Sequence, residues 1–416
     1  MGFCLVALAT LAIAGGAMAQ VTLSGRASID MSTWQAVNST AGSASDLASR
    51  TRVADNGSRI TFSANEDLGG GMKAGLYCET GINVDNAERT GQSASTNANT
   101  TTWCSREGRA YFGNNLVEVR LGRQNVFWTS GAPDATGSNL GGSSISANLY
   151  GGGVGLYGTR LENMIKLVAG SEAGAFAGSE VYTGFMQSPV DAGSLGGTFD
   201  YQLATQTGES AKAGVSGGGY NGFKLTYNSG PLNLMVDYQS YSKSAAIAGV
   251  TSAGVSSVIK NSFSGNATKY QVGYALGGES IVSAQYWTKS RTDETNSAAA
   301  FSNSAAGTAG SATDSGWVVN YNHDFKNSFV GYAQYGKGNN ITGGPSATEQ
   351  AGTDVTAYTL GALKRFSKRT HIFATYHNIT NGANINYNMT GGSYASGTAP
   401  NGSVVTMTAL GMIHNF

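Results

Sequence analysis

Hydrophobic and polar residues alternate with a period of two along most of the chain. In the stretch 58–79, Ile60 and Phe62 fall on one face, and Arg59 and Thr61 fall on the other. A period of two is typical of β-strands, because successive side chains of a strand point to opposite faces. The same alternation recurs as far as the last residues, so the sequence predicts an all-β protein built from antiparallel strands.

The connections between these strands are of two kinds. Short corners, such as 68–71 and 229–231, alternate with long polar segments, such as 187–217 and 243–266. Bacterial transmembrane barrels show this asymmetry, with tight turns at one rim and long loops at the other. We predict sixteen strands in one closed sheet, at 20–34, 58–67, 72–83, 105–113, 116–124, 159–169, 179–187, 218–228, 232–242, 267–276, 279–289, 315–324, 328–336, 354–366, 370–380 and 403–416.

Aromatic residues decide which face of the strands meets lipid. The apolar faces carry Tyr, Phe and Trp towards the strand ends, where the aromatic girdles of a barrel would lie. The chain ends in VVTMTALGMIHNF, with Leu410, Met412 and Phe416 on one face. Outer-membrane barrels commonly finish on such a strand with a terminal Phe. We therefore expect the apolar face to meet lipid and the polar face to line a water-filled lumen.

Composition narrows the class of protein further. The 416 residues include 60 Gly, and only 12% of residues are charged, with 25 cations against 25 acids. This balance gives no electrostatic reason to expect nucleic acid as a partner. An apolar run followed by an A-x-A pattern at 17–19 predicts a signal peptide over 1–19 and a mature chain of 20–416. No later stretch could form a spanning helix, so any crossing of a membrane requires a closed barrel.

Two cysteines remain after the predicted cleavage. Cys78 and Cys104 flank a segment rich in Ser, Thr and Asn, and export makes a disulfide between them chemically permissible. Two unpaired buried thiols are the open alternative. Two thiols alone do not support a metal site, and no cofactor is expected.

Several segments resemble one family. In order, SRITFSANEDLGGGMKAGLYCE, REGRAYFGNNLVEVRLGRQNV, RLENMIKL, FSKRTHIFATYHNITN and GMIHNF are similar to segments of the general diffusion porins of beta-proteobacterial outer membranes. The resemblance implies a 16-stranded antiparallel transmembrane β-barrel, a homotrimer, and a third long loop folded into the pore. It also implies an outer-membrane location among lipid and lipopolysaccharide, and passive diffusion of small hydrophilic solutes and inorganic ions.

A constriction is expected where this third loop, 125–158, faces the wall. Its one charged residue is Asp134. The alternation directs six cations inward from neighbouring strands, and Glu118 and Glu162 would partly offset them. The predicted inward cations are Arg26, Arg59, Arg109, Arg120, Arg160 and Lys166.

The resemblance also assigns roles to some of these residues. Arg59 and Arg160 match arginines that line the constriction of anion-preferring family members. Arg106 aligns with a third such position, but Glu107 stands where a further arginine would be expected. A ring of one sign in a narrow throat concentrates the opposite ion, so we expect a modest anion preference.

Other functions stay open at this stage. A substrate-specific porin for an anionic solute or a sugar is the main alternative, and a surface adhesin barrel is a further one. An enzyme is not expected, because none of His323, His371, His377 and His414 sits in a recognisable catalytic motif. The basic corner over 364–369 is interpreted as a solvated turn or as a contact to lipid head groups.

Overall fold

The computed structural model describes most of the chain after the predicted signal peptide. The described residues are 20–82, 84, 103–125, 145–151, 160–169, 198–206, 218–250, 256–277, 279–295, 310–325, 328–343, 351–389 and 399–416. The signal peptide predicted over 1–19 lies outside this part. Among the described residues, no helix combines the length and the apolar character that a bilayer crossing requires.

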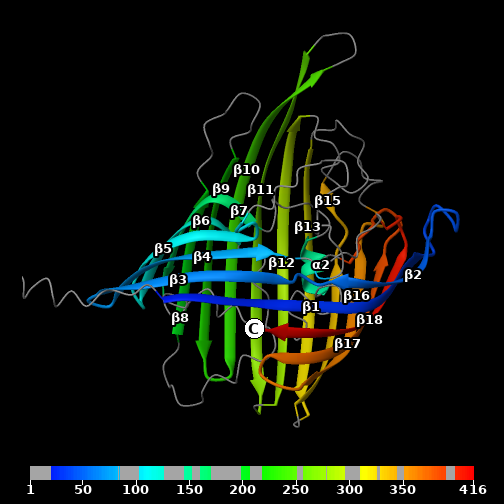
Figure 1. Ribbon diagram of the computed structural model, residues 1–416. Helices are drawn as coiled ribbons and strands as arrows, with labels where there is room; N and C mark the ends of the chain where they lie inside the picture. The colour runs from blue at the N-terminus through cyan, green and yellow to red at the C-terminus, as the bar shows by residue number, and fades with distance from the viewer. Residues whose placement is uncertain are drawn as a thin grey trace, which may run out of the picture.

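Strands dominate the described residues (Figure 1). In chain order they are β1 (Gln20–Val37), β2 (Leu47–Asp55), β3 (Arg59–Gly69), β4 (Met72–Gly81), β5 (Glu107–Gly113), β6 (Val117–Asn125), β7 (Arg160–Ala169), β8 (Thr198–Gln206), β9 (Gly218–Ser229), β10 (Leu232–Val250), β11 (Ser256–Leu276), β12 (Ser280–Thr295), β13 (Gly310–Asp324), β14 (Phe329–Gly338), β15 (Thr342–Gly343), β16 (Val355–Arg365), β17 (Thr370–Asn381) and β18 (Val404–Asn415). A short helix, α2 (Ile145–Gly151), precedes β7.

The strand pairings form a closed ring. Strand β1 pairs with β18 along one edge and with β2 and β3 along the other. The remaining strands pair with their neighbours in sequence, so the sheet returns to its start. Strands β2 and β3 are one long strand interrupted at 56–58, and β15 continues β14 along β13. The eighteen segments therefore make the sixteen-stranded barrel that the alternation predicts.

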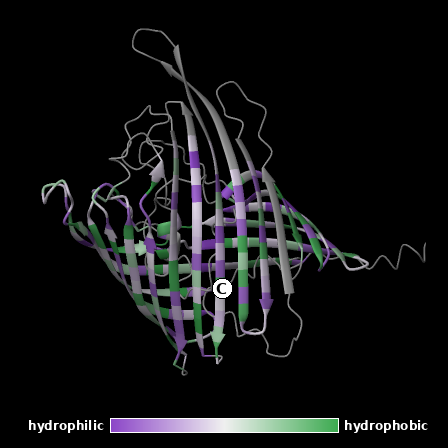
Figure 2. Cartoon of the chain, turned by 180° about the vertical axis from the view of Figure 1, so that it is seen from behind, coloured by the Kyte–Doolittle hydropathy of each residue, from purple (hydrophilic) through white to green (hydrophobic). Residues whose placement is uncertain are grey.

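The two faces of the sheet are those of a membrane barrel. Large apolar side chains are exposed on the outer face, and polar and charged ones are buried on the inner face, the reverse of a soluble protein. Figure 2 shows the resulting alternation as bands of hydrophobic and hydrophilic residues along the strands. Among the outward residues are Val119, Leu121, Leu234, Val272, Val319, Leu360 and Leu410, and among the inward ones are Arg26, Glu79, Gln239, Gln271, Asn320, Gln334 and His377.

One predicted strand is misplaced. The strand expected at 179–187 lies outside the described residues, and the strand between β7 and β9 is β8, Thr198–Gln206. The expectation that 187–217 is entirely a loop is therefore wrong. The sequence TFDYQLATQ also alternates, with apolar residues at 199, 201 and 203 and polar ones at 200 and 202. The alternating pattern fits both 179–187 and 198–206. Pairing with β7 and β9 identifies 198–206 as the strand.

Several strands run further than predicted. The segment 243–266 was expected to be a loop, but β10 and β11 continue their pairing out to Val250 and Ser256. This hairpin extends well beyond the rest of the barrel in Figure 1. Parts of 35–57 and 290–314 are likewise strand. Small polar residues had suggested loops there, but a hydrogen-bonded partner strand compensates for their weak β-propensity.

The outward placement of Leu121 gives a direct test of this orientation. The side chain is 49% exposed on the outer face of β6 and pairs with Ala110 and Ile165. We expect Leu121→Arg to lower the free energy of unfolding in lipid vesicles by about 2–4 kcal/mol, because a cation there would enter hydrocarbon. Urea titration measures the change, with Leu121→Met as the matched control. Equal stability of the two variants would contradict a lipid-facing position.

Candidate pore constriction

A group of cations lines the inner wall from β1 to β7. Arg26 and Arg59 are direct partners across β1 and β3, and Arg120 pairs with Lys166 across β6 and β7. Partners in antiparallel strands point to the same face. The low exposure of Arg26, Arg109 and Lys166 agrees with an inward direction.

Glu79 gathers three of the arginines around one carboxylate. Its Oε2 lies 3.3 Å from Nε of Arg59, and its Oε1 accepts a hydrogen bond from Nε of Arg106. Arg160 interacts electrostatically with the same carboxylate. The tyrosine hydroxyl of Tyr77 donates to it over 3.1 Å. One carboxylate is thus shared among several guanidinium groups, which leaves a local excess of positive charge.

A second group lies further along the same wall. Arg109 forms an ion pair with Glu107, and its guanidinium carbon lies 4.4 Å from the centre of the Tyr77 ring. Nε of Arg120 is 2.5 Å from Oε1 of Glu118.

The ammonium of Lys166 belongs to this group as well. It donates to the backbone carbonyl of Asn125 over 2.5 Å and interacts electrostatically with Glu107. These contacts hold the long side chains against the wall, so the charges occupy fixed positions.

A β-bulge interrupts the alternation between the two groups. The register between β6 and β7 shifts between Gly122 and Gln124, and Gly122 has a φ of 129°. A side chain at Gly122 would collide with the carbonyl of Gly108, 2.2 Å from an added Cβ. The side-chain amide of Gln124 reaches across the bulge and donates to the backbone carbonyl of Met164 over 3.4 Å. Bulges commonly redirect side chains near functional sites.

Two further inward cations were missed by the sequence analysis. Arg50 and Arg52 lie on β2, opposite Trp34 and Ser32 of β1. The guanidinium of Arg50 stacks over the Trp34 ring at 4.7 Å from its centre. Both belong to the polar segment 35–57, which lies between two predicted strands and resembles a loop. The alternation of LASRTRVAD was the available signal, and it would have extended the row of arginines along the wall.

The opposite wall holds helix α2 inside the barrel (Figure 1). The hydroxyl of Tyr150 accepts from the Gln239 amide over 3.1 Å, and its carbonyl accepts from the Lys289 ammonium over 2.6 Å. At the other end, the Ile145 amide donates to Gln334. A helix of seven residues is marginal alone, so these contacts to the wall hold it in place. Helix α2, the described part of 125–158 after Asn125, therefore lies inside the barrel, while the rest of the predicted third loop lies outside the described residues.

Buried lysine–carboxylate pairs surround the anchored tyrosine. Nζ of Lys269 lies 3.1 Å from Oδ2 of Asp237, and Nζ of Lys289 lies 3.1 Å from Oδ2 of Asp314. Both ammonium groups also lie over the Tyr150 ring, at 5.0 and 5.4 Å from its centre. Because each of these two lysines has a carboxylate partner, the two pairs add little net charge to the lumen.

An apolar cluster fills the space between α2 and the wall. Ile145 and Leu149 pack with residues of several strands and with the segment after β17, which contributes Ile385, Tyr387 and Met389. Asn381 fixes that segment by accepting from the Tyr387 amide over 2.7 Å. One side of the lumen is therefore filled by packed side chains, and the side from β1 to β7 carries the cations.

The predicted site residues are only partly brought together. Arg59 and Arg160 share Glu79 as a neighbour, and Arg109, Arg120 and Lys166 form the second group. Arg26 donates to Ser28 over 3.2 Å beside Arg59. Asp134 lies outside the described residues, as does the side chain of Glu162.

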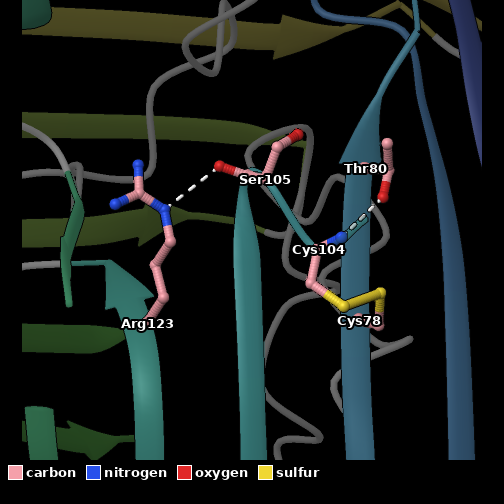
Figure 3. The surroundings of a disulfide bond; sticks show 5 residues. All are labelled: Cys78, Thr80, Cys104, Ser105 and Arg123. Carbon is pink, nitrogen blue, oxygen red and sulfur yellow. Dashed lines mark hydrogen bonds between the residues drawn. A yellow bond between two sulfur atoms is a disulfide. The ribbon is translucent and has the colours of Figure 1, made fainter. Parts of the chain in front are cut away.

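The disulfide lies on the outer face of β4, and Figure 3 shows the residues around it. Cys78 and Cys104 are bonded, with their Cα atoms 4.5 Å apart, and the Cys104 amide donates to the Thr80 hydroxyl over 2.9 Å. Cys78 shares its face of β4 with the exposed Leu76, which is the outer face. The bond therefore ties the end of β4 to the segment leading into β5.

In the described part of the chain, His323, His377 and His414 form hydrogen bonds to hydroxyl groups. His377 is buried and contacts the hydroxyls of Thr359 and Thr375 at 2.7 and 3.2 Å. Nδ1 of His323 lies 2.7 Å from the Ser280 hydroxyl, but His323 shares the outer face of β13 with Tyr321.

A closed ring of sixteen strands, apolar outside and charged inside, defines an outer-membrane β-barrel with a polar lumen. The chain belongs to the Gram-negative porin family, whose model matches residues 5–384. The family places the protein in the outer membrane. Its members are channels, which confirms that the chain is not an enzyme.

Curated relatives agree with this assignment over part of their length. A major outer membrane protein P.IB of Neisseria gonorrhoeae is 40% identical over 80 residues, which are 19% of this chain and 23% of that protein. The P.IB protein of Neisseria lactamica is 30% identical over 136 residues, or 33% of this chain and 35% of that protein. The matches thus span about a quarter to a third of these relatives.

Solved structures show the same fold over nearly the whole chain. An anion-selective porin from Comamonas acidovorans superposes with a TM-score of 0.67 at 18% identity, over 96% of this chain and 100% of that chain. The trimer form of OmpT of Vibrio cholerae superposes with a TM-score of 0.58 at 11% identity, over 96% and 99% of the two chains. At these identities the likeness concerns the fold.

The packing of Leu149 predicts how the current through the pore would change if α2 were held less tightly. Leu149 is buried in the apolar cluster, and a buried Leu→Ala change costs about 2–5 kcal/mol. We expect Leu149→Ala to loosen α2 and to increase open-channel current noise in single-channel recordings. Leu276→Ala, at an exposed outer position, is the control. Identical noise in the two variants would show that this packing does not hold the constriction.

Proposed function

We propose that the protein forms a water-filled channel through which small hydrophilic solutes and inorganic ions diffuse passively. The family supports this function, and so does the inner wall, which is polar along the strands. Solutes need no chemical step to cross, because the gradient drives them. Helix α2 and the apolar cluster would limit solute size by filling one side of the lumen.

The observation that carries the selectivity is the excess of cations over carboxylates on one wall. On the wall from β1 to β7, the named cations outnumber the buried carboxylates Asp30, Glu79, Glu107 and Glu118. Fixed charges of one sign in a narrow throat raise the local concentration of the opposite ion. Arginine suits this role because it stays charged and can bind carboxylate or phosphate through its planar fork. We infer a preference for anions, moderated by these carboxylates.

The fold comparison agrees with a preference for anions but does not establish it. The Comamonas acidovorans protein is described as anion-selective, and its fold matches nearly all of this chain. At 18% identity, the charges of this chain have to carry the inference themselves.

A salt gradient across a planar bilayer tests both whether a channel forms and whether it prefers anions or cations. We expect wide, ohmic channels whose reversal potential indicates a modest chloride preference. Arg160→Gln should move that potential towards cations, because it removes a charge beside Glu79. Arg369→Gln removes an exposed charge at a turn and is the matched control. Silent bilayers would overturn the channel, and an unchanged potential in Arg160→Gln would remove this residue from the throat.

We also propose that three copies associate. The Vibrio cholerae OmpT with the same fold is described in a trimer form. On this chain, an apolar groove on the outer face of β1, β2, β17 and β18 could receive a neighbouring copy. It is lined mainly by Ile29, Met31, Val53, Ile372, Leu410 and Met412.

Sedimentation in detergent would count the copies in each particle. We expect trimers for the native protein and smaller particles for Val53→Arg, because a cation would enter the apolar contact. Val319→Arg changes another outward valine, on β13, and should remain trimeric. A monomeric native protein would contradict the proposal, and a trimeric Val53→Arg variant would place the interface elsewhere.

A further inference from the structure

The corner between β16 and β17 carries charge and aromatic surface that the pore does not use. Four cations fall within six residues, Lys364, Arg365, Lys368 and Arg369, with Phe366 between them. Phe366 is 65% exposed. The corner belongs to the rim of short turns, which faces the periplasm in bacterial barrels.

Hydrogen bonds fix the shape of this corner. The amides of Phe366 and Ser367 both donate to the carbonyl of Thr370, at 2.9 and 3.2 Å. The Ser367 hydroxyl accepts from the amides of Arg369 and Thr370, at 3.1 and 3.0 Å. The carbonyl of Arg369 accepts from Asn415 of β18 over 2.8 Å. A fixed backbone presents the side chains with little loss of entropy on binding.

The nearby acid does not neutralise the exposed cations. Asp324 pairs with Arg365, whose Nη1 lies 3.6 Å from Oδ2. Lys368 and Arg369 are exposed, and neither forms an ion pair within the described part of the chain. Two positive charges are therefore available to an anion from outside the protein.

Aromatic rings lie beside these charges on the lipid-facing wall. Lys364 pairs with Phe329 and Ile372 on the outer face. Phe325 lies against the same wall, with its ring 2.8 Å from a Cβ added to Gly331, and it is 57% exposed. At a turn surrounded by water, exposed phenylalanine rings are unfavourable. At a membrane boundary, phenylalanine buries its ring among acyl chains.

We propose that this corner binds the headgroup of an anionic phospholipid in the periplasmic leaflet. The phosphate oxygens would accept hydrogen bonds from the ammonium of Lys368 and the guanidinium of Arg369. Lys364 lies on the outer face beside Phe329, and the acyl chains would lie against Phe325, Phe329 and Phe366. The proposal rests on the outer-membrane location and not on conduction, so failure of the channel experiment would leave it intact.

Lipid retention by the purified full-length barrel tests this site. Native mass spectrometry would compare bound phosphatidylglycerol with bound phosphatidylcholine of identical acyl chains. We expect the native protein to retain phosphatidylglycerol preferentially. Lys368→Gln and Arg369→Gln should each weaken that preference about fivefold, the effect of removing one cation near an anionic membrane surface.

Three further variants separate this site from charge or folding effects in general. Lys368→Arg and Arg369→Lys keep the charge and should keep the preference. Lys73→Gln removes a cation from the same rim whose ammonium already donates to Asn115 over 3.1 Å, and it should change nothing. Equal retention of the two lipids, or an unchanged preference in both glutamine variants, would overturn the proposal. Preferential retention of lipopolysaccharide at this corner would also overturn it, and unaltered channel conductance would verify folding.

Discussion

The need to satisfy every backbone hydrogen bond inside lipid determines the rest of the structure. Hydrocarbon offers no partner for an amide or a carbonyl, so a sheet that crosses a bilayer has to close on itself. Here β1 closes the ring by pairing with β18 and with the interrupted strand formed by β2 and β3. Closure separates an outer surface from an inner one. Each strand contributes to both, because its successive side chains point alternately outward and inward.

The inner surface is itself divided into two unlike sides. From β10 to β18 the lumen is occupied by α2, by the segment after β17 and by the apolar cluster between them, which also includes Trp34 of β1 and Ala54 of β2. From β1 to β7 it presents arginines and a lysine in contact with a few carboxylates. Lys269 and Lys289 face inward on the filled side, but each is matched by an aspartate. The named arginines therefore line a different part of the wall from the residues that pack around α2.

The two sides do different physical work. Packing around Leu149 and Tyr150 would determine how wide the passage is, because a rigid helix occupies volume. The cations would determine which ions enter, because their charge acts over several ångströms in a poorly hydrated throat. Glu79 and Glu118 keep the long guanidinium side chains in place at the cost of some positive potential.

Sequence reasoning recovered the fold because a period of two is a local property of each strand. It identified the orientation of the faces, the inward direction of residues such as Arg59 and Lys166, and the family. It failed where local signals were ambiguous. Both 179–187 and 198–206 could be strands, and the polar segment containing Arg50 and Arg52 resembled a loop.

Alternation along the chain is enough to specify a barrel with an apolar outside and a charged inside. Which charges meet is a property of the folded sheet, because those contacts depend on the register between strands and on the bulge at Gly122. The gathering of Arg59, Arg106 and Arg160 at Glu79, and the anchoring of α2 by Gln239 and Lys289, join residues far apart in the chain. Such contacts arise only once the ring has closed.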